Sequence, residues 1–139
     1  PASIDFPLLL SNLPTIHLQA YSLETVVAEK FHTMLDRDTL NSRMKDFFDC
    51  YQLLTKRILD TDMLYDAIKA TFDNRRLAYN PHLHLFSDAF VTDADRNKQW
   101  KSFLRKIQWK ENLDFQTVMQ VIKDRLQPMA EKYFEENKS

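Results

Sequence analysis

The most constraining feature of this sequence is that it contains no glycine. None of its 139 residues is glycine, whereas roughly 10 would be expected at the usual frequency of about 7%. Loops that cradle phosphates need glycine where the backbone adopts a positive φ or approaches a ligand closely. The sequence therefore excludes a P-loop and a Rossmann dinucleotide fingerprint within these residues.

Composition and charge indicate one folded domain without a dominant electric field. Hydrophobic residues make up 44% of the chain and charged residues 28%, and the formal net charge is −1. Any attraction to nucleic acid or to an anionic membrane must therefore be local. The single cysteine, Cys50, excludes an internal disulfide and is typical of a small buried residue in a reducing compartment. Since no apolar run is long enough to span a membrane, we expect a cytoplasmic protein without a membrane partner.

The first 21 residues differ from the rest because they hold three of the five prolines, which restrict helix formation. Two short apolar stretches, at 4–6 and 16–21, could form edge strands, yet two such strands make no stable sheet alone. We therefore expect residues 1–21 to form a short extended arm whose strands belong with a sheet outside this sequence. The chain begins at Pro1 rather than at methionine, which suggests a piece of something longer.

From residue 22 onward, apolar residues recur at helical spacing. Ser22 is a predicted N-cap for a helix that ends near Asp36, and Asn41 is a predicted N-cap for the next helix. That second helix is expected to bury one apolar face, formed by Met44, Phe47, Phe48, Tyr51, Leu54 and Ile58.

Three further helices are predicted. One runs from about 62 to 74, one starts at a capping box formed by Thr92 and Asp95, and one starts near Asp114. Pro128 should kink or interrupt the last helix, and residues 80–86 are expected to run extended. The fold class is therefore a single mainly α-helical domain over residues 1–139, with about five packed helices in a helical body at 22–139.

Lys30 stands in a place that a helical core does not require. At 100° per residue it lies about 20° from Leu23 and about 40° from Met34, so it flanks the buried arc of the first helix. One interpretation is that its stem covers apolar surface while its charge stays in water. The other is that the packed stem holds the ammonium at the edge of a cleft, where it is available to a phosphate.

Asp46 and Asp49 stand three residues apart on the second helix, one helical step around a face. Paired acids usually form a solvated face, but Asp46 follows Arg43 and Lys45 and shares its side of the helix with apolar residues. A carboxylate so placed could accept a proton or bind a cation. Arg37, Arg43 and Lys45 also lie near the start of this helix, where free backbone amides favour an anion.

Two other patterns are weaker. His82 and His84 alternate, but no third ligand follows at an evident spacing, which disfavours a metal site. Six basic residues lie opposite the Trp100 face of the fourth helix and could touch nucleic acid, although an ordinary solvated surface is the favoured interpretation. They are Arg96, Lys98, Lys101, Arg105, Lys106 and Lys110.

Two motifs together resemble a known family. The segments YSLETVVAEKFHTMLDR at 21–37 and NSRMKDFFDCYQL at 41–53 resemble the C-terminal half of the AbiEii/AbiGii nucleotidyltransferase toxins of abortive-infection and toxin–antitoxin systems. In that family a YSLETVxAEKF run is followed by a loop and by R-x-K-D-[FY]-[FY]-D. The similarity extends to IDFPLLL at 4–10, FDNRR at 72–76 and W-x-x-F-L at 100–104, so it covers most of the chain.

The resemblance implies the C-terminal part of a DNA-polymerase-β-like α+β nucleotidyltransferase. In such proteins the N-terminal sheet supplies a Gly-Ser turn and a D-x-D metal pair, and the helical half supplies a lysine and an aspartate, here Lys30 and Asp46. Lys30 would neutralise the triphosphate, and Asp46 would orient or deprotonate the acceptor, or hold Lys30 in place. Arg43, Lys45 and Asp49 would contact the substrate. The implied cofactors are Mg²⁺ and a nucleoside triphosphate, and the implied partners are an antitoxin and, in some members, tRNA.

The sequence departs from that pattern in the metal-binding half. It has no Gly-Ser turn, and its three D-x-D strings, at 36–38, 60–62 and 93–95, fall at predicted helix ends or in loops. We therefore expect the nucleotidyltransferase core to lie outside this sequence and this fragment alone to be inactive. The alternative is a non-catalytic helical module whose apolar and basic faces bind an antitoxin or a structured RNA.

Overall fold

The computed structural model describes residues 22–36, 43–80 and 83–137. These ranges form helices and no strand, which confirms the mainly α-helical class, whereas the expected extended arm lies outside the described residues. The elements are α3 (Leu23–Asp36), α4 (Met44–Lys56), α5 (Thr61–Asn74), the 3₁₀ turn η2 (His84–Phe86), α6 (Asp88–Val91), α7 (Ala94–Lys106) and α8 (Phe115–Glu136).

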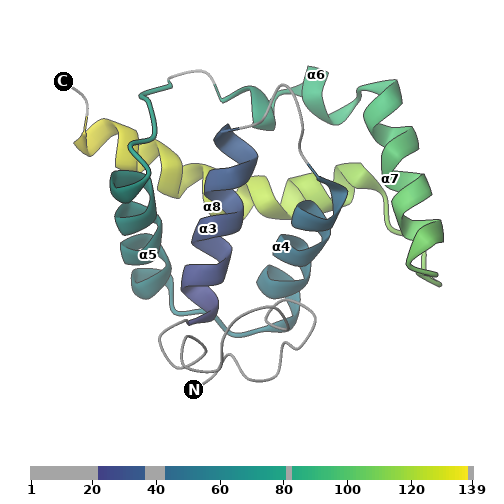
Figure 1. Ribbon diagram of the computed structural model, residues 1–139, viewed down its shortest axis with the longest axis horizontal. Coiled ribbons are helices and arrows are strands. Elements are labelled where there is room, and N and C mark those ends of the chain that lie inside the picture. The colour runs from purple at the N-terminus through teal and green to yellow at the C-terminus, as the bar shows by residue number, and fades with distance from the viewer. Residues whose placement is uncertain (1–21, 37–42, 81–82, 138–139) are drawn as a thin grey trace.

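Three helices lie side by side in the order α5, α3, α4, and the long helix α8 crosses them (Figure 1). The core fills the space between this row and α8, with fully buried Phe31 from α3, Phe47 from α4, Phe72 from α5 and Ile122 from α8. Helix α7 lies at the edge beyond α4, on the opposite side of the molecule from α5. The packing of α3 against α4 is what positions the candidate site.

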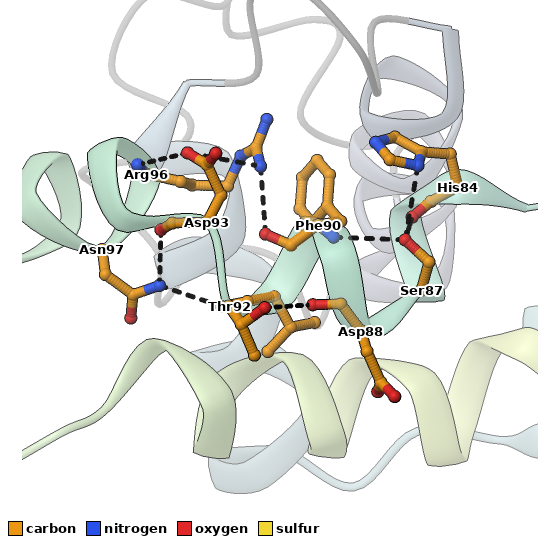
Figure 2. Close-up of polar contacts among 9 residues, drawn as sticks. His84, Ser87, Asp88, Phe90, Thr92, Asp93, Arg96 and Asn97 are labelled. Atoms are coloured by element: carbon orange, nitrogen blue, oxygen red, sulfur yellow. Dashed lines mark hydrogen bonds and ion pairs between the residues drawn. The ribbon is translucent and has the colours of Figure 1, made fainter.

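Capping side chains explain where most helices begin. The Ser22 hydroxyl accepts a hydrogen bond from the Thr25 N–H at 3.1 Å, as predicted. Helix α8 begins directly after Asp114, whose side chain makes no capping bond. The predicted capping box at Thr92 and Asp95 is wrong. Asp93 caps α7 by accepting from the Arg96 N–H at 2.8 Å (Figure 2). Thr92 is already engaged at the end of α6, where its hydroxyl donates to the Asp88 carbonyl.

The segment expected to run extended is instead partly helical. Residues 81–82 lie outside the described part, but 84–86 form η2 and α6 follows directly. The cause is Ser87, whose hydroxyl donates to the His84 carbonyl at 2.7 Å and accepts from the Phe90 N–H at 3.2 Å (Figure 2). One side chain therefore closes two consecutive turns, a local effect that periodicity does not reveal.

Two further expectations about α4 need correction. Its N-cap position is Arg43, which makes no side-chain capping bond, and Asn41 lies outside the described residues. The helix ends at Lys56 because Arg57 adopts extended backbone angles. Ile58 therefore leaves the apolar face and is fully exposed.

Pro128 does not interrupt the last helix, since α8 continues from Phe115 to Glu136. Proline removes one backbone donor from a helix. Pro128 itself is exposed, whereas Leu126 and Ala130 on either side of it are fully buried in the core. The packing of this buried face against the core thus keeps α8 helical although Pro128 lacks a backbone N–H to donate.

The absence of glycine has a visible consequence at two helix ends. Arg76 after α5 and Gln108 after α7 have φ values of 53° and 59°, the left-handed region that glycine normally fills. In each case the next residue, Leu77 or Trp109, donates its N–H to a carbonyl five residues earlier, at 3.0 and 2.9 Å. Both helices therefore end in Schellman motifs built with side-chain-bearing residues, at a conformational cost of about 1–2 kcal/mol each.

Candidate functional site between α3 and α4

Lys30 of α3 and Asp46 of α4 face each other directly. The Lys30 Nζ donates to Asp46 Oδ1 at 2.8 Å and lies 3.3 Å from Asp49 Oδ2. The three side chains are only 20%, 11% and 12% exposed, respectively. The ammonium thus lies between two carboxylates. The interpretation in which Lys30 merely extends its charge into water is therefore wrong.

Two further cations flank this ion pair on its solvent side. Lys45 Nζ lies 2.7 Å from Asp49 Oδ2, and Arg43 Nε lies 3.8 Å from Asp46 Oδ2. Their side chains are 55% and 74% exposed. Three cationic side chains therefore face two carboxylates, which leaves one positive charge in excess. The sequence-predicted residues Lys30, Arg43, Lys45, Asp46 and Asp49 all belong to this one cluster, whereas Arg37 lies outside the described residues.

The electrostatics keep the Lys30 ammonium charged. Burial lowers the pKa of Lys30, but the hydrogen bond to Asp46 and the charges of Asp46 and Asp49 outweigh burial, so the pKa lies above its ordinary value. Beside the cluster, burial raises the pKa of the Cys50 thiol to about 12. Cys50 is therefore a buried apolar residue and not a thiolate nucleophile, as the sequence indicated.

A second polar contact, which the sequence analysis missed, fixes α3 on its other side. Glu29, the residue before Lys30, accepts from Arg75 Nη2 at 2.7 Å and from the Thr71 hydroxyl at 3.4 Å. Both partners belong to the end of α5, in and beside the FDNRR segment. An ion pair on one face of α3 thus restrains the helix that carries Lys30. The only signal in the sequence was an acidic residue directly before the candidate lysine.

The cluster fits a phosphate better than a metal ion. The described residues contain no group of three or more His, Cys, Asp and Glu side chains placed to hold a metal. The oxygens of Asp46 and Asp49 that face Lys30 and Lys45 are already neutralised by ammonium groups, so these carboxylates do not fit Mg²⁺. An ammonium has three N–H donors, and two carboxylates account for two of those of Lys30. The third N–H of Lys30 can donate to an anionic group, which the exposed cations of Arg43 and Lys45 also attract.

The remaining candidates have structural roles. Asp60 and Asp93, which begin two of the D-x-D strings, accept backbone N–H bonds as the N-caps of α5 and α7. His84 Nδ1 lies 3.3 Å from the Ser87 hydroxyl (Figure 2), and His82 lies outside the described residues. Of the six basic residues between 96 and 110, Arg96 is half-buried and the other five are exposed.

Comparison with known proteins identifies a family. Residues 1–121 match a family model described as the nucleotidyl transferase AbiEii toxin of a type IV toxin–antitoxin system. No curated protein and no solved structure was found to match. Within the described ranges, no helix combines the length and apolar character that a membrane crossing requires.

Proposed function

This chain belongs to the AbiEii nucleotidyl transferase toxin family, and we propose that its α3–α4 cluster is part of a site for nucleotide transfer. The observation that carries the proposal is the ion pair at 2.8 Å between the lysine of the AEK motif and the aspartate of the KDFFD motif. The two motifs lie on different helices, so their meeting depends on the fold and not on their closeness in sequence. Membership in a toxin–antitoxin family also implies an antitoxin that counteracts the protein.

In this proposal Lys30 binds the triphosphate of a nucleoside triphosphate. Its third N–H donor, together with the exposed cations of Arg43 and Lys45, supplies positive charge to the phosphate oxygens. Charge-assisted hydrogen bonds of this kind are stronger than neutral ones. The raised pKa of Lys30 supports the role because the ammonium stays protonated throughout the neutral range.

Asp46 acts on the acceptor. An acceptor oxygen attacks the α-phosphorus of the nucleotide, the bond from that phosphorus to the β-phosphate oxygen breaks, and pyrophosphate leaves. Asp46 orients the acceptor hydroxyl and takes its proton through the carboxylate oxygen that Lys30 does not bind. A positioned base of this type contributes about 10²–10⁴-fold to a rate.

Asp49 holds Lys30 in position. It lies 3.3 Å from the Lys30 ammonium and 2.7 Å from that of Lys45. When Asp46 engages an acceptor, Asp49 remains as a partner for Lys30 and prevents the side chain from turning away. This role differs from the substrate contact that the resemblance implied.

The metal-binding half of the site is proposed to lie outside this sequence, because the described carboxylates do not fit Mg²⁺ and the chain contains no Gly-Ser turn. Mg²⁺, when bound there, supplies charge neutralisation at the reacting phosphate. We expect these 139 residues alone to be inactive, and the intact protein to act in the cytoplasm on an RNA or protein acceptor.

The test measures nucleotide transfer by the intact natural protein, with labelled GTP or ATP and Mg²⁺. Lys30→Ala and Asp46→Asn are expected to lower the rate by about 10²-fold or more, since each removes a charge that acts on the reacting groups. Circular dichroism checks that the variants remain folded.

Two exposed residues of α5 provide matched controls. Lys69→Ala and Asp66→Asn make the same chemical changes away from the cluster and should leave transfer within about twofold. Folded Lys30→Ala and Asp46→Asn proteins that transfer as well as these controls would contradict the proposal and favour the non-catalytic interaction module.

A further inference from the structure

The charge of this protein is unevenly distributed. The 15 residues from Arg96 to Lys110 carry six basic and no acidic side chains, although the net charge of the whole chain is only −1. Arg96 is used internally, because its guanidinium lies 3.7 Å from the centre of the Phe90 ring and donates to the Phe90 carbonyl (Figure 2). The other five are exposed.

Three of these cations form a row on the outer face of α7. At 100° per residue, Lys98, Lys101 and Arg105 lie within about 60° of one another and about 100–160° around the helix from the buried Trp100. None of the three has a carboxylate within ion-pair distance among the described residues, and Arg105 bonds only the Ser102 hydroxyl. By contrast, the cations of the α3–α4 cluster are all paired. The row on α7 thus offers uncompensated positive charge along about 10 Å of helix.

A groove of about 540 Å³ lies beside this row. Helix α7 contributes Lys101 and Arg105, and the connection to α8 with the first turn of α8 contributes polar and acidic side chains. The volume lies within the range of roughly 300–1,000 Å³ that is usual for small-molecule sites. The polar and acidic side chains are those of Glu111, Asn112, Asp114 and Gln116.

We propose that this surface binds single-stranded RNA, with phosphates along α7 and one base and its ribose in the groove. The cations of α7 attract phosphates, while the carboxylates of Glu111 and Asp114 repel them and can accept from base amino groups. An acidic protein partner is repelled in the same way, but it offers no base amino groups to these carboxylates. A single strand has unpaired bases that can enter the groove, whereas the bases of a duplex are paired with each other and cannot. The amides of Asn112 and Gln116 suit a ribose 2′-hydroxyl, which distinguishes RNA from DNA.

The surface adjoins the helix of the candidate site but does not depend on its function. Phe48 of α4 packs against Trp100, Phe103 and Trp109, with ring centroids 6.4, 5.6 and 5.1 Å apart. Around α4, Lys45 lies between Asp49 and Phe48, on the side toward α7. RNA binding would stand even if the protein transferred no nucleotide.

The test measures fluorescence anisotropy of a fluorescein-labelled 12-nucleotide single-stranded RNA with the protein, in EDTA and without nucleoside triphosphate. Three phosphate contacts predict a slope of about −2 for log K against log salt concentration. Lys98→Glu/Lys101→Glu should weaken binding at least about tenfold and reduce the slope to about −0.7. The control Lys56→Glu/Lys69→Glu changes two exposed lysines elsewhere by the same charge and should stay within about threefold.

Two further arms test the kind of partner. DNA of the same sequence should bind at least about threefold more weakly than RNA, and Asn112→Ala/Gln116→Ala should abolish that difference. Poly-glutamate should not displace the RNA. The inference is overturned if the Lys98→Glu/Lys101→Glu variant and the Lys56→Glu/Lys69→Glu control lose RNA binding equally. It is also overturned if RNA and DNA bind with equal affinity, or if poly-glutamate displaces the RNA.

Discussion

At the scale of single residues, Lys30 shows what a sequence can and cannot reveal. Its place beside the apolar arc of α3 follows from helical periodicity alone. The identity of its partners does not follow from periodicity, because Asp46 and Asp49 contact Lys30 only through the packing of α3 against α4. The ion pair is therefore a tertiary feature. The two motifs that resemble the family indicated these residues as candidates, and the structure supplies the 2.8 Å contact between Lys30 and Asp46.

Replacing Lys30 tests that ion pair through stability. Lys30→Gln leaves two carboxylates side by side with little exposure, so we expect a loss on the order of 2 kcal/mol at pH 8, below the 3–5 kcal/mol typical of fully buried pairs. The folded-state pKa of Lys30 is raised, so its contribution is complete below the ordinary value of 10.5 and is lost as pH rises through the folded-state pKa.

The measurement is urea unfolding of both proteins between pH 8 and 11. The difference in unfolding free energy should be constant at the lower pH values and begin to shrink above about pH 10.5. A difference that is zero at pH 8, or that grows with pH, would show that the contact does not stabilise the fold.

At the scale of elements, the long helices were predictable and their ends were less so. Apolar spacing located α3, α4, α5 and α8, because each buries one continuous face, and α7, which buries Trp100 and partly covers Phe103 and Leu104. The short elements η2 and α6 were not predicted, because η2 has only 3 residues and α6 only 4, too few to show a hydrophobic period. Their turns depend on the hydroxyl of Ser87. Likewise, Asp93 rather than Thr92 caps α7. Hydrophobic periodicity does not distinguish between two adjacent candidate caps.

The helix end at Gln108 allows a prediction about glycine. Gln108→Gly should stabilise the protein by about 0.5–1 kcal/mol, because it removes the cost of a positive φ, partly offset by the greater freedom of glycine in the unfolded chain. Gln108→Ala keeps a β-carbon and should give no comparable gain. Thermal unfolding of the two variants compares them, and equal stability of the two would show that the left-handed backbone costs nothing here.

At the scale of the whole molecule, two charged regions lie on helices that an aromatic contact joins. The α3–α4 cluster holds paired charges with one positive charge in excess, and α7 carries a row without carboxylate partners. Phe48 of α4 packs against Phe103 of α7, with ring centroids 5.6 Å apart, and these two helices are neighbours in Figure 1. The sequence revealed each set of charges but not their arrangement, since that depends on how α4 packs against α3 and α7.

The central claim is that the Lys30 ammonium, held between two carboxylates, binds phosphate. Calorimetric titration of the intact natural protein with GTP and with ATP, each with Mg²⁺, tests this most directly. Lys30→Ala should raise the Kd for the bound nucleotide at least about tenfold, the loss of one charge-assisted hydrogen bond. Lys69→Ala on α5 should leave it within about twofold. A folded Lys30→Ala protein that binds the nucleotide as tightly as the Lys69→Ala protein would contradict the claim.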